Sequence, residues 1–344
     1  MNIVLSEGTH MRLAWIALFL WPLLCTAQTA RRDSVRQRMH ERMYQIDSVL
    51  AEKRNRGNYD TAYIARPQAR LTMKIRSNVS GTAFHVKGEM ADYKVRSNLN
   101  TDYKATVSIG ANYRGISAGL ALNPASLSGR NSDYELNLNS YSNRYGFDVV
   151  FQSSRTLSGH VTTNGKDYFA DKDVMDMRML AVNGYYAFNG RRFSYPAAFS
   201  QSYMQKRSAG SWLLGFSYQG GTLKAGKHKP ESLPDFSIGV GHLGIGGGYG
   251  YNLVLGHRWL VHLSALPVLS IFNRNNVKVD GQRQDLNNKF TDLMLTERAA
   301  IVRNMGEKYF ACATLVMNNS LLGDGDGYIN YRKWRVRLAF GIRL

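Results

Sequence analysis

The C-terminal segment of the chain alternates strictly between two kinds of side chain. From position 334, every second residue is large and apolar, and the residues between are three arginines, an alanine and a glycine. Successive side chains of a strand point to opposite faces, so one face is entirely apolar. The segment 334–344 has the ~9–11 residues that a tilted strand needs to cross a bilayer. The predicted lipid-facing residues are Trp334, Val336, Leu338, Phe340, Ile342 and Leu344.

The same alternation recurs upstream, in segments separated by Gly, Asn, Asp and Ser. Small or polar residues stand opposite large apolar ones, as in Tyr103–Gly110 and Trp212–Tyr218. This pattern predicts an all-β, antiparallel transmembrane barrel of about twelve strands, with about ten or fourteen as alternatives. The further predicted strands are Leu71–Ser77, Phe84–Arg96, Ile116–Asn123, Tyr134–Tyr141, Phe147–Ser153, Met175–Phe188, Gly241–Leu253, Trp259–Ile271, Asp292–Arg303 and Tyr309–Met317.

Closure of a barrel requires its first strand to pair with its last. The inward faces of Leu71–Ser77 and of the C-terminal segment carry only basic charges, and the acidic residues that we expect inside, such as Glu135 and Asp148, are few. A wet lumen would then favour anions, and a sealed barrel would bury these cations against the N-terminal helix or a loop. The predicted lumen-facing basic residues are Lys74, Arg76, Arg335, Arg337 and Arg343.

The start of the chain follows a different pattern. Met11-Arg12 precede an uncharged apolar run, Leu13–Cys25, and small residues follow it, which is the order of a secretory signal peptide. The run is shorter than the ~20 residues with which a helix crosses a bilayer. We therefore predict cleavage between Ala27 and Gln28, and we interpret residues 1–10 as the product of an upstream start codon.

Between the signal peptide and the barrel, residues 28–66 are predicted to form a periplasmic helix and linker, because Val35, Met39, Met43 and Ile46 recur at helical spacing. The barrel is expected to occupy residues 67–344. After cleavage a single cysteine, Cys312, remains. The mature chain can form no internal disulfide, and its stability must come from packing and hydrogen bonds.

The net charge of +19 would indicate nucleic-acid binding in a cytoplasmic protein. Export excludes that partner, and the remaining anionic candidates are the phosphates of lipopolysaccharide and acidic glycans. We expect contacts with outer-membrane lipids, with lipopolysaccharide and with the barrel assembly machinery, which recognises a C-terminal strand. The pattern does not identify a ligand.

Three short motifs suggest chemistry. Gly239–Gly244 matches the dinucleotide fingerprint in its letters, but more glycines follow where that fold needs a helix. Asp324–Gly327 resembles the beginning of a calcium loop that lacks its later acidic ligands. His262 and Ser264 share one face of a strand, as a base and a nucleophile would, although that face is the predicted inner one. We expect no cofactor, no metal and no catalytic residue.

Four stretches of the chain together resemble a known family. They are Tyr59-Asp60-Thr61-Ala62-Tyr63-Ile64, Tyr113-Arg114-Gly115-Ile116-Ser117 leading to Asn123-Pro124, Asn143-Arg144-Tyr145-Gly146-Phe147-Asp148, and Phe193 to Phe199 followed by Gln205 to Ser211. The chain is similar to the Bacteroidetes family of domain of unknown function 4421, from about Tyr59 to Leu344. The resemblance implies an outer-membrane barrel and supplies no activity.

The leading hypothesis is therefore a non-enzymatic outer-membrane barrel, either a narrow pore or a ligand-binding or scaffolding component of the cell envelope. One alternative is an outer-membrane hydrolase acting on lipid or glycan. Another is a soluble periplasmic β-sandwich that binds glycans.

Overall fold

The computed structural model of the chain forms two compact units, residues 1–57 and 58–344. The described residues are 41–42, 44–45, 48, 57–90, 93–113, 116–122, 133–231, 234–256, 258–286, 292–323 and 327–344. Residues 41–42, 44–45 and 48 of the first unit are helical. The predicted signal peptide and its cleavage site lie outside the described residues. No helix in these ranges is long and apolar enough to cross a membrane.

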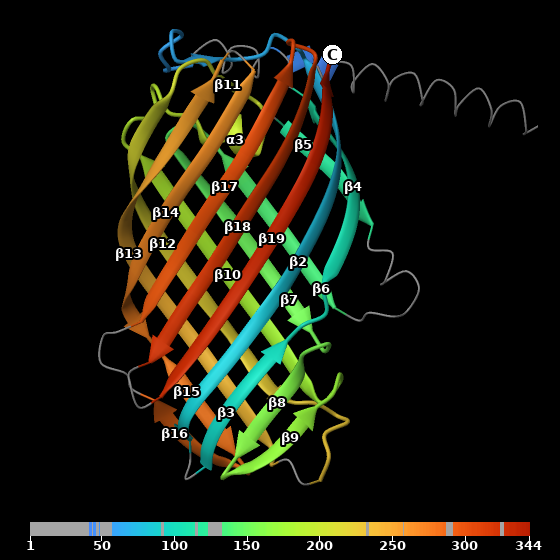
Figure 1. The fold of residues 1–344 in the computed structure, drawn as a ribbon, viewed down its shortest axis with the longest axis vertical. Helices are drawn as coiled ribbons and strands as arrows, with labels where there is room; N and C mark the ends of the chain where they lie inside the picture. The colour runs from blue at the N-terminus through green and yellow to red at the C-terminus, as the bar shows by residue number, and fades with distance from the viewer. Residues whose placement is uncertain are drawn as a thin grey trace, which may run out of the picture. The chain divides into compact units, whose positions relative to one another are not determined.

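The second unit is built on one large, curled antiparallel sheet, with strands of up to 20 residues (Figure 1). The wall strands are β2 (Leu71–Met90), β4 (Lys104–Tyr113), β5 (Ile116–Leu122), β6 (Tyr134–Tyr141), β7 (Tyr145–Ser154), β10 (Met175–Ala187), β12 (Ala209–Ala225), β13 (Phe236–Leu255), β14 (Trp259–Asn273), β17 (Leu293–Met305), β18 (Tyr309–Gly323) and β19 (Tyr328–Arg343). The predicted antiparallel barrel is confirmed. The alternative of two packed sheets in a soluble sandwich is wrong.

Pairing around the wall follows the order β7-β10-β12-β13-β14-β17-β18-β19-β2-β4-β5, and β6 stands between β5 and β7 in the strand order. The predicted pairing of the first strand with the last is confirmed, because β2 and β19 are in register from Thr72 opposite Arg343 to Lys87 opposite Tyr328. This contact joins the two ends of the second unit.

Five further strands prolong the sheet at the end away from the C-terminus (Figure 1). They are β3 (Tyr93–Asn100), β8 (Ser158–Thr163), β9 (Lys166–Ala170), β15 (Asn275–Val279) and β16 (Gln282–Leu286). The sequence pattern predicted two separate strands, Leu71–Ser77 and Phe84–Arg96, with a break between residues 77 and 84. This break is wrong. β2 runs through it unbroken to Met90, because its lower half pairs with β3 after its upper half has paired with β4.

Connections at the two ends differ in length. Near the C-terminus, β6 and β7 are joined by three residues, as are β17 and β18, whereas ten residues join β12 and β13 at the other end. Outer-membrane barrels have short periplasmic turns and longer extracellular loops. By this rule, we expect the end that carries the C-terminus to be the periplasmic end. The 21-residue connection between β10 and β12 at the same end is an exception, and it folds back into the lumen.

The outer surface of the wall is apolar. Leu338 and Phe340 of β19 are 57% and 50% exposed, and Ile75 on the neighbouring β2 is 59% exposed. Val336 and Leu344 are exposed as well, whereas Trp334 and Ile342 are half-buried. Trp334 lies edge-on to Tyr103, and its indole lies over Gly81 on β2, where a Cβ atom would be 2.9 Å from the ring.

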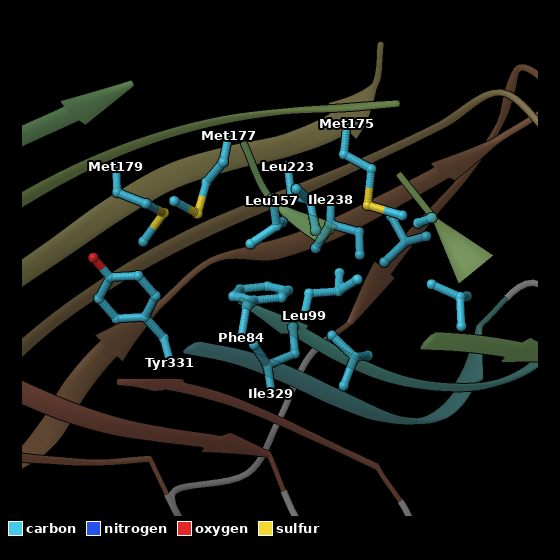
Figure 2. Packing of buried hydrophobic residues seen from close by; sticks show 14 of the residues in the cluster. Phe84, Leu99, Leu157, Met175, Met177, Met179, Leu223, Ile238, Ile329 and Tyr331 are labelled. Atoms are coloured by element: carbon cyan, nitrogen blue, oxygen red, sulfur yellow. The ribbon is translucent and has the colours of Figure 1, made fainter. Parts of the chain in front are cut away.

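The lumen at the end away from the C-terminus is filled by an apolar cluster. Met177 and Met179 of β10 point across it toward Phe84 and Tyr331 from the opposite wall (Figure 2). These methionines explain why the apolar positions of β10 change face: Met175, Met177 and Met179 face the apolar cluster inside, whereas farther along the strand the inward position 183 is an asparagine. The register of β10 with both neighbours is continuous, so the segment needs no bulge.

The lumen at the periplasmic end is filled by part of the connection between β10 and β12. This connection folds back into a short helix, α3 (Tyr195–Phe199), and a strand, β11 (Met204–Gln205), which pairs with β1 (Ile64–Ala65). Ser194 caps the helix, and all five helical residues are buried. Gly250 on the wall allows this approach, because a Cβ atom there would lie 3.0 Å from the ring of Phe193.

Candidate functional site

Three of the five predicted lumen-facing cations line one cavity. Lys74 and Arg76 on β2 and Arg337 on β19 all contribute to a cavity of about 310 Å³. The register of the two strands brings them together, since Arg337 stands opposite Asn78, two residues along β2 from Arg76.

The other two predicted cations do not line this cavity. Arg343 is buried nearer the C-terminus, with its guanidinium 4.6 Å from the centre of the Phe310 ring. It donates hydrogen bonds to the carbonyl of Glu307 at 3.2 Å and to the side chain of Asn304 at 3.1 Å. Arg335 is half-buried, and it stands opposite Ser80, farther from the C-terminus than Arg337.

Two of the three cavity cations, Lys74 and Arg337, have neutral hydrogen-bond partners. Lys74 donates a hydrogen bond to the carbonyl of Ser200, and the Nε of Arg337 donates one to the side chain of Asn78 at 2.7 Å. The Nε of Arg76 is buried and has no hydrogen-bond partner among the described residues. Within the same part of the chain, none of the three forms an ion pair.

The rest of the cavity wall is mostly polar. Its position near the periplasmic end follows from the register, because Lys74 stands opposite Gly341, three residues before the C-terminus. The remaining lining residues are Gly110, Ala111, Asn139, Ser140, Tyr141, Phe199, Ser200, Gln201, Ser202, Cys312 and Ala339. The thiol of Cys312 is free.

The two acidic residues expected inside the barrel pair with other cations. Asp148 on β7 accepts hydrogen bonds from Arg298 on β17 and from the hydroxyl of Tyr141. Glu135 on β6 accepts one from Lys333 on β19 at 2.6 Å. All four charged residues of these two pairs have nearly buried side chains. The sequence pattern singled out neither cation of these pairs: Arg298 lies at an inward position of a predicted strand, and Lys333 directly precedes the predicted C-terminal strand, which begins at Trp334.

His262 and Ser264 belong to a buried hydrogen-bonded chain. The Nε2 of His262 lies 3.0 Å from the hydroxyl of Ser264, and its Nδ1 lies 2.7 Å from the side-chain oxygen of Asn252. Tyr195 of α3 donates a hydrogen bond to Ser264 at 2.9 Å, and Asn252 donates one to the carbonyl of Ser194 at 3.0 Å. The chain therefore ties the N-terminal end of α3 to the wall.

This arrangement resembles a base that is oriented by an amide and placed beside a hydroxyl. However, His262 is completely buried, and the rings of Phe193, Tyr195 and Phe199 lie 5.0–5.9 Å from it. Neither His262 nor Ser264 lines the basic cavity. In this geometry α3 occupies the side from which a substrate would approach the hydroxyl.

Of the other two motifs, the structure describes the glycine-rich one in full. Gly239–Gly244 lies inside strand β13, which continues to Leu255, so no helix follows it as the dinucleotide fingerprint requires. Asp324–Asp326 lies outside the described residues. In the described part of the chain, no group of three His, Cys, Asp or Glu residues is placed to hold a metal ion.

Solved structures with a similar arrangement include three proteins of outer membranes. The outer membrane protease OmpT from Escherichia coli is 6% identical, with a TM-score of 0.37 over 81% of this chain and 97% of that one. The toluene transporter TodX from P. putida is 7% identical, with a TM-score of 0.25 over 81% and 91%. The translocator domain of the autotransporter NalP from Neisseria meningitidis is 9% identical, with a TM-score of 0.29 over 91% and 98%.

No curated protein matches the sequence. A protein family does match it, over residues 58–343, which is almost the whole of the barrel unit. The chain belongs to the family described as Domain of unknown function (DUF4421).

Proposed function

We propose that this protein is an outer-membrane barrel with a filled interior, which serves the envelope as a ligand-binding or scaffolding component and not as an open pore. The observation that carries the proposal is the filling of the lumen at both ends. An apolar cluster occupies one end, and the segment containing α3 occupies the other. Between them lie the ion pairs of Asp148 with Arg298 and of Glu135 with Lys333.

The chemistry of the wall supports the membrane location. Large apolar side chains such as Trp212, Leu263 and Leu269 are more than 60% exposed on the outside. Soluble monomers rarely expose contiguous apolar patches beyond about 300–600 Å². In a bilayer the same side chains face lipid. The expected partners are therefore outer-membrane lipids and lipopolysaccharide, together with the assembly machinery that recognises strand β19.

Conductance across a planar bilayer tests the filled interior. The protein is purified from outer membranes in detergent, and unheated and boiled samples are compared by electrophoresis to establish that the barrel is folded. We expect a heat-dependent shift in mobility and no stable channel steps. Reproducible anion-selective steps from the folded protein would contradict the proposal and favour the narrow pore instead.

A second candidate function, hydrolysis, has one observation in its favour, the contacts among Asn252, His262 and Ser264. A serine-reactive fluorophosphonate probe tests it. Because α3 covers Ser264, we expect the same labelling of the unmodified protein and of the Ser264→Ala variant. Labelling that disappears in Ser264→Ala would make the enzyme the better proposal.

A further inference from the structure

We propose that the basic cavity binds a small solute that carries a phosphate group and hydroxyls, of the size of a sugar phosphate. This inference rests on the proposed function, since it requires a filled barrel with a defined binding space. It names the class of ligand, which neither the family nor the fold supplies.

Charge balance is the first argument. Lys74, Arg76 and Arg337 line one cavity, and within the described residues none of them has an acidic partner. An uncompensated charge inside a protein is costly, and the cost falls when an opposite charge binds beside it. In the same lumen, Arg298 and Lys333 each have a carboxylate. The cavity cations therefore differ from the paired cations of the same lumen, because among the described residues they have no acidic partner.

The available donors are the second argument. The Nε of Arg76 is buried without a partner, so one donor in a confined space is not used by the protein itself. Arginine presents a planar set of donors that matches phosphate oxygens, and lysine adds a point charge. The hydroxyls of Ser140 and Ser202 line the same space and suit the hydroxyl groups of a sugar.

Size and location complete the argument. Ligand cavities typically measure about 300–1,000 Å³, and this cavity of about 310 Å³ is at the lower limit, which suits a small solute better than a lipid. It lies near the C-terminal end, which is the periplasmic end by the lengths of the connections. The solute would therefore be one found in the periplasm.

Calorimetric titration of the full-length protein in uncharged detergent, at low ionic strength, tests the proposal. The probes are inorganic phosphate, glucose 6-phosphate and, as the neutral match, glucose. We expect saturable binding of both phosphates, tighter for the sugar phosphate, and no binding of glucose. Added salt is expected to weaken the binding, because it screens the charges.

Variants locate the site. Arg76→Gln combined with Arg337→Gln should weaken phosphate binding at least tenfold. Arg332→Gln, which removes an exposed charge from the same strand β19, should leave it unchanged. Ala339→Leu keeps every charge but fills part of the cavity, so it should weaken glucose 6-phosphate more than inorganic phosphate. The heat-dependent mobility shift shows which variants are folded, and Ala339→Leu supplies the test if the charge variant does not fold.

The alkylation rate of the Cys312 thiol gives an independent readout, because Cys312 lines the cavity and its thiol is free. Both phosphates should slow its alkylation by maleimide, and glucose should not. Failure of the unmodified protein to bind either phosphate, or unchanged binding in the double glutamine variant, would overturn the proposal. Protection of Cys312 by phosphatidylglycerol vesicles alone would overturn it too, because the phosphate would then be lipid-borne. Bilayer conductance tests the proposed function separately. If the barrel does not conduct and does not bind phosphate, the proposed function stands and only the phosphate site is wrong.

Discussion

Two groups of cations lie inside the barrel, and they differ in what surrounds them. Arg298 and Lys333 each contact a buried carboxylate. Lys74, Arg76 and Arg337 line a cavity, where Lys74 and Arg337 donate hydrogen bonds to neutral groups and the Nε of Arg76 has no partner among the described residues. Both groups have the same chemistry and the same inward position on a strand.

The difference separates two uses of an interior charge. A buried pair joins strands that are far apart around the wall, as Arg298 of β17 does with Asp148 of β7, and so it fixes the packing of the lumen. An unpaired group beside a cavity leaves its donors for a solute. We therefore expect the paired cations to affect stability most, and the cavity cations to affect binding most.

Breaking a buried pair should give the largest effect. Asp148→Asn keeps the shape of the side chain but leaves the charge of Arg298 without its partner, which typically costs about 3–5 kcal/mol. The free energy of unfolding, measured by guanidinium titration in lipid vesicles with tryptophan fluorescence, should fall by that amount. Asp148→Leu combined with Arg298→Leu should cost less than the sum of its single changes. A loss below about 1 kcal/mol in Asp148→Asn would mean that the pair does not stabilise the barrel.

A cation placed on the outer face extends the comparison of paired and unpaired cations, because the lipid around it offers no acidic or polar partner. Leu338→Lys should cost about 2–4 kcal/mol and reduce assembly, since Leu338 is exposed on the wall away from the strand end. Ile342→Lys should cost less, because it lies four residues nearer the interface. Leu338→Met, which adds no charge, is the matched control. Equal stability of all three variants would contradict a bilayer-facing wall.

The sequence predicted the wall well because a bilayer imposes a period of two on every spanning strand. At the C-terminal end, four of the six predicted lipid-facing residues are exposed, namely Val336, Leu338, Phe340 and Leu344. The strands beyond the membrane escaped prediction, because they are short and face water or the apolar cluster. A usable signal existed: Asn164-Gly165 and Asp280-Gly281 adopt the positive φ angles of hairpin turns between β8 and β9 and between β15 and β16.

The site was predictable only in part. Alternation places Lys74, Arg76 and Arg337 on inward faces, and closure makes their strands neighbours. Which cation meets a carboxylate depends on contacts across the lumen, such as that between β7 and β17, and no local pattern encodes them. The same holds for α3, since nothing in the run from Tyr195 to Phe199 says that it folds inward.

A glycine beside the cavity tests how the cavity cations are held. Gly341 stands opposite Phe310, and a Cβ atom there would overlap the ring. Gly341→Ala must therefore displace a ring that lies near both Lys74 and Arg343. Such overpacking typically costs about 1–3 kcal/mol. We expect a loss of unfolding free energy in that range together with weaker phosphate binding. A loss of stability without any change in phosphate affinity would show that the Phe310 ring does not position the cations that bind phosphate.

An exposed ion pair gives the smallest expected effect, and it completes the comparison with the buried pairs. Lys172 lies in the connection between β9 and β10, outside the spanning strands, and its ammonium is 2.7 Å from the carboxylate of Asp102. The hydrogen bond to Asp102, and then its charge, raise the pKa of Lys172 above its usual value. A raised lysine pKa stabilises the fold at neutral pH, and this contribution disappears as the pH rises through the raised pKa.

Because both side chains are substantially exposed, water and salt screen the pair. Lys172→Ala should therefore cost less than about 1 kcal/mol at neutral pH, and the difference from the unmodified protein should vanish at alkaline pH or in high salt. Guanidinium titrations of the two proteins at several pH values measure this. A cost comparable to that of Asp148→Asn would show that burial is not what distinguishes the ion pairs of this barrel, and the division between structural and ligand-binding cations would lose its physical basis.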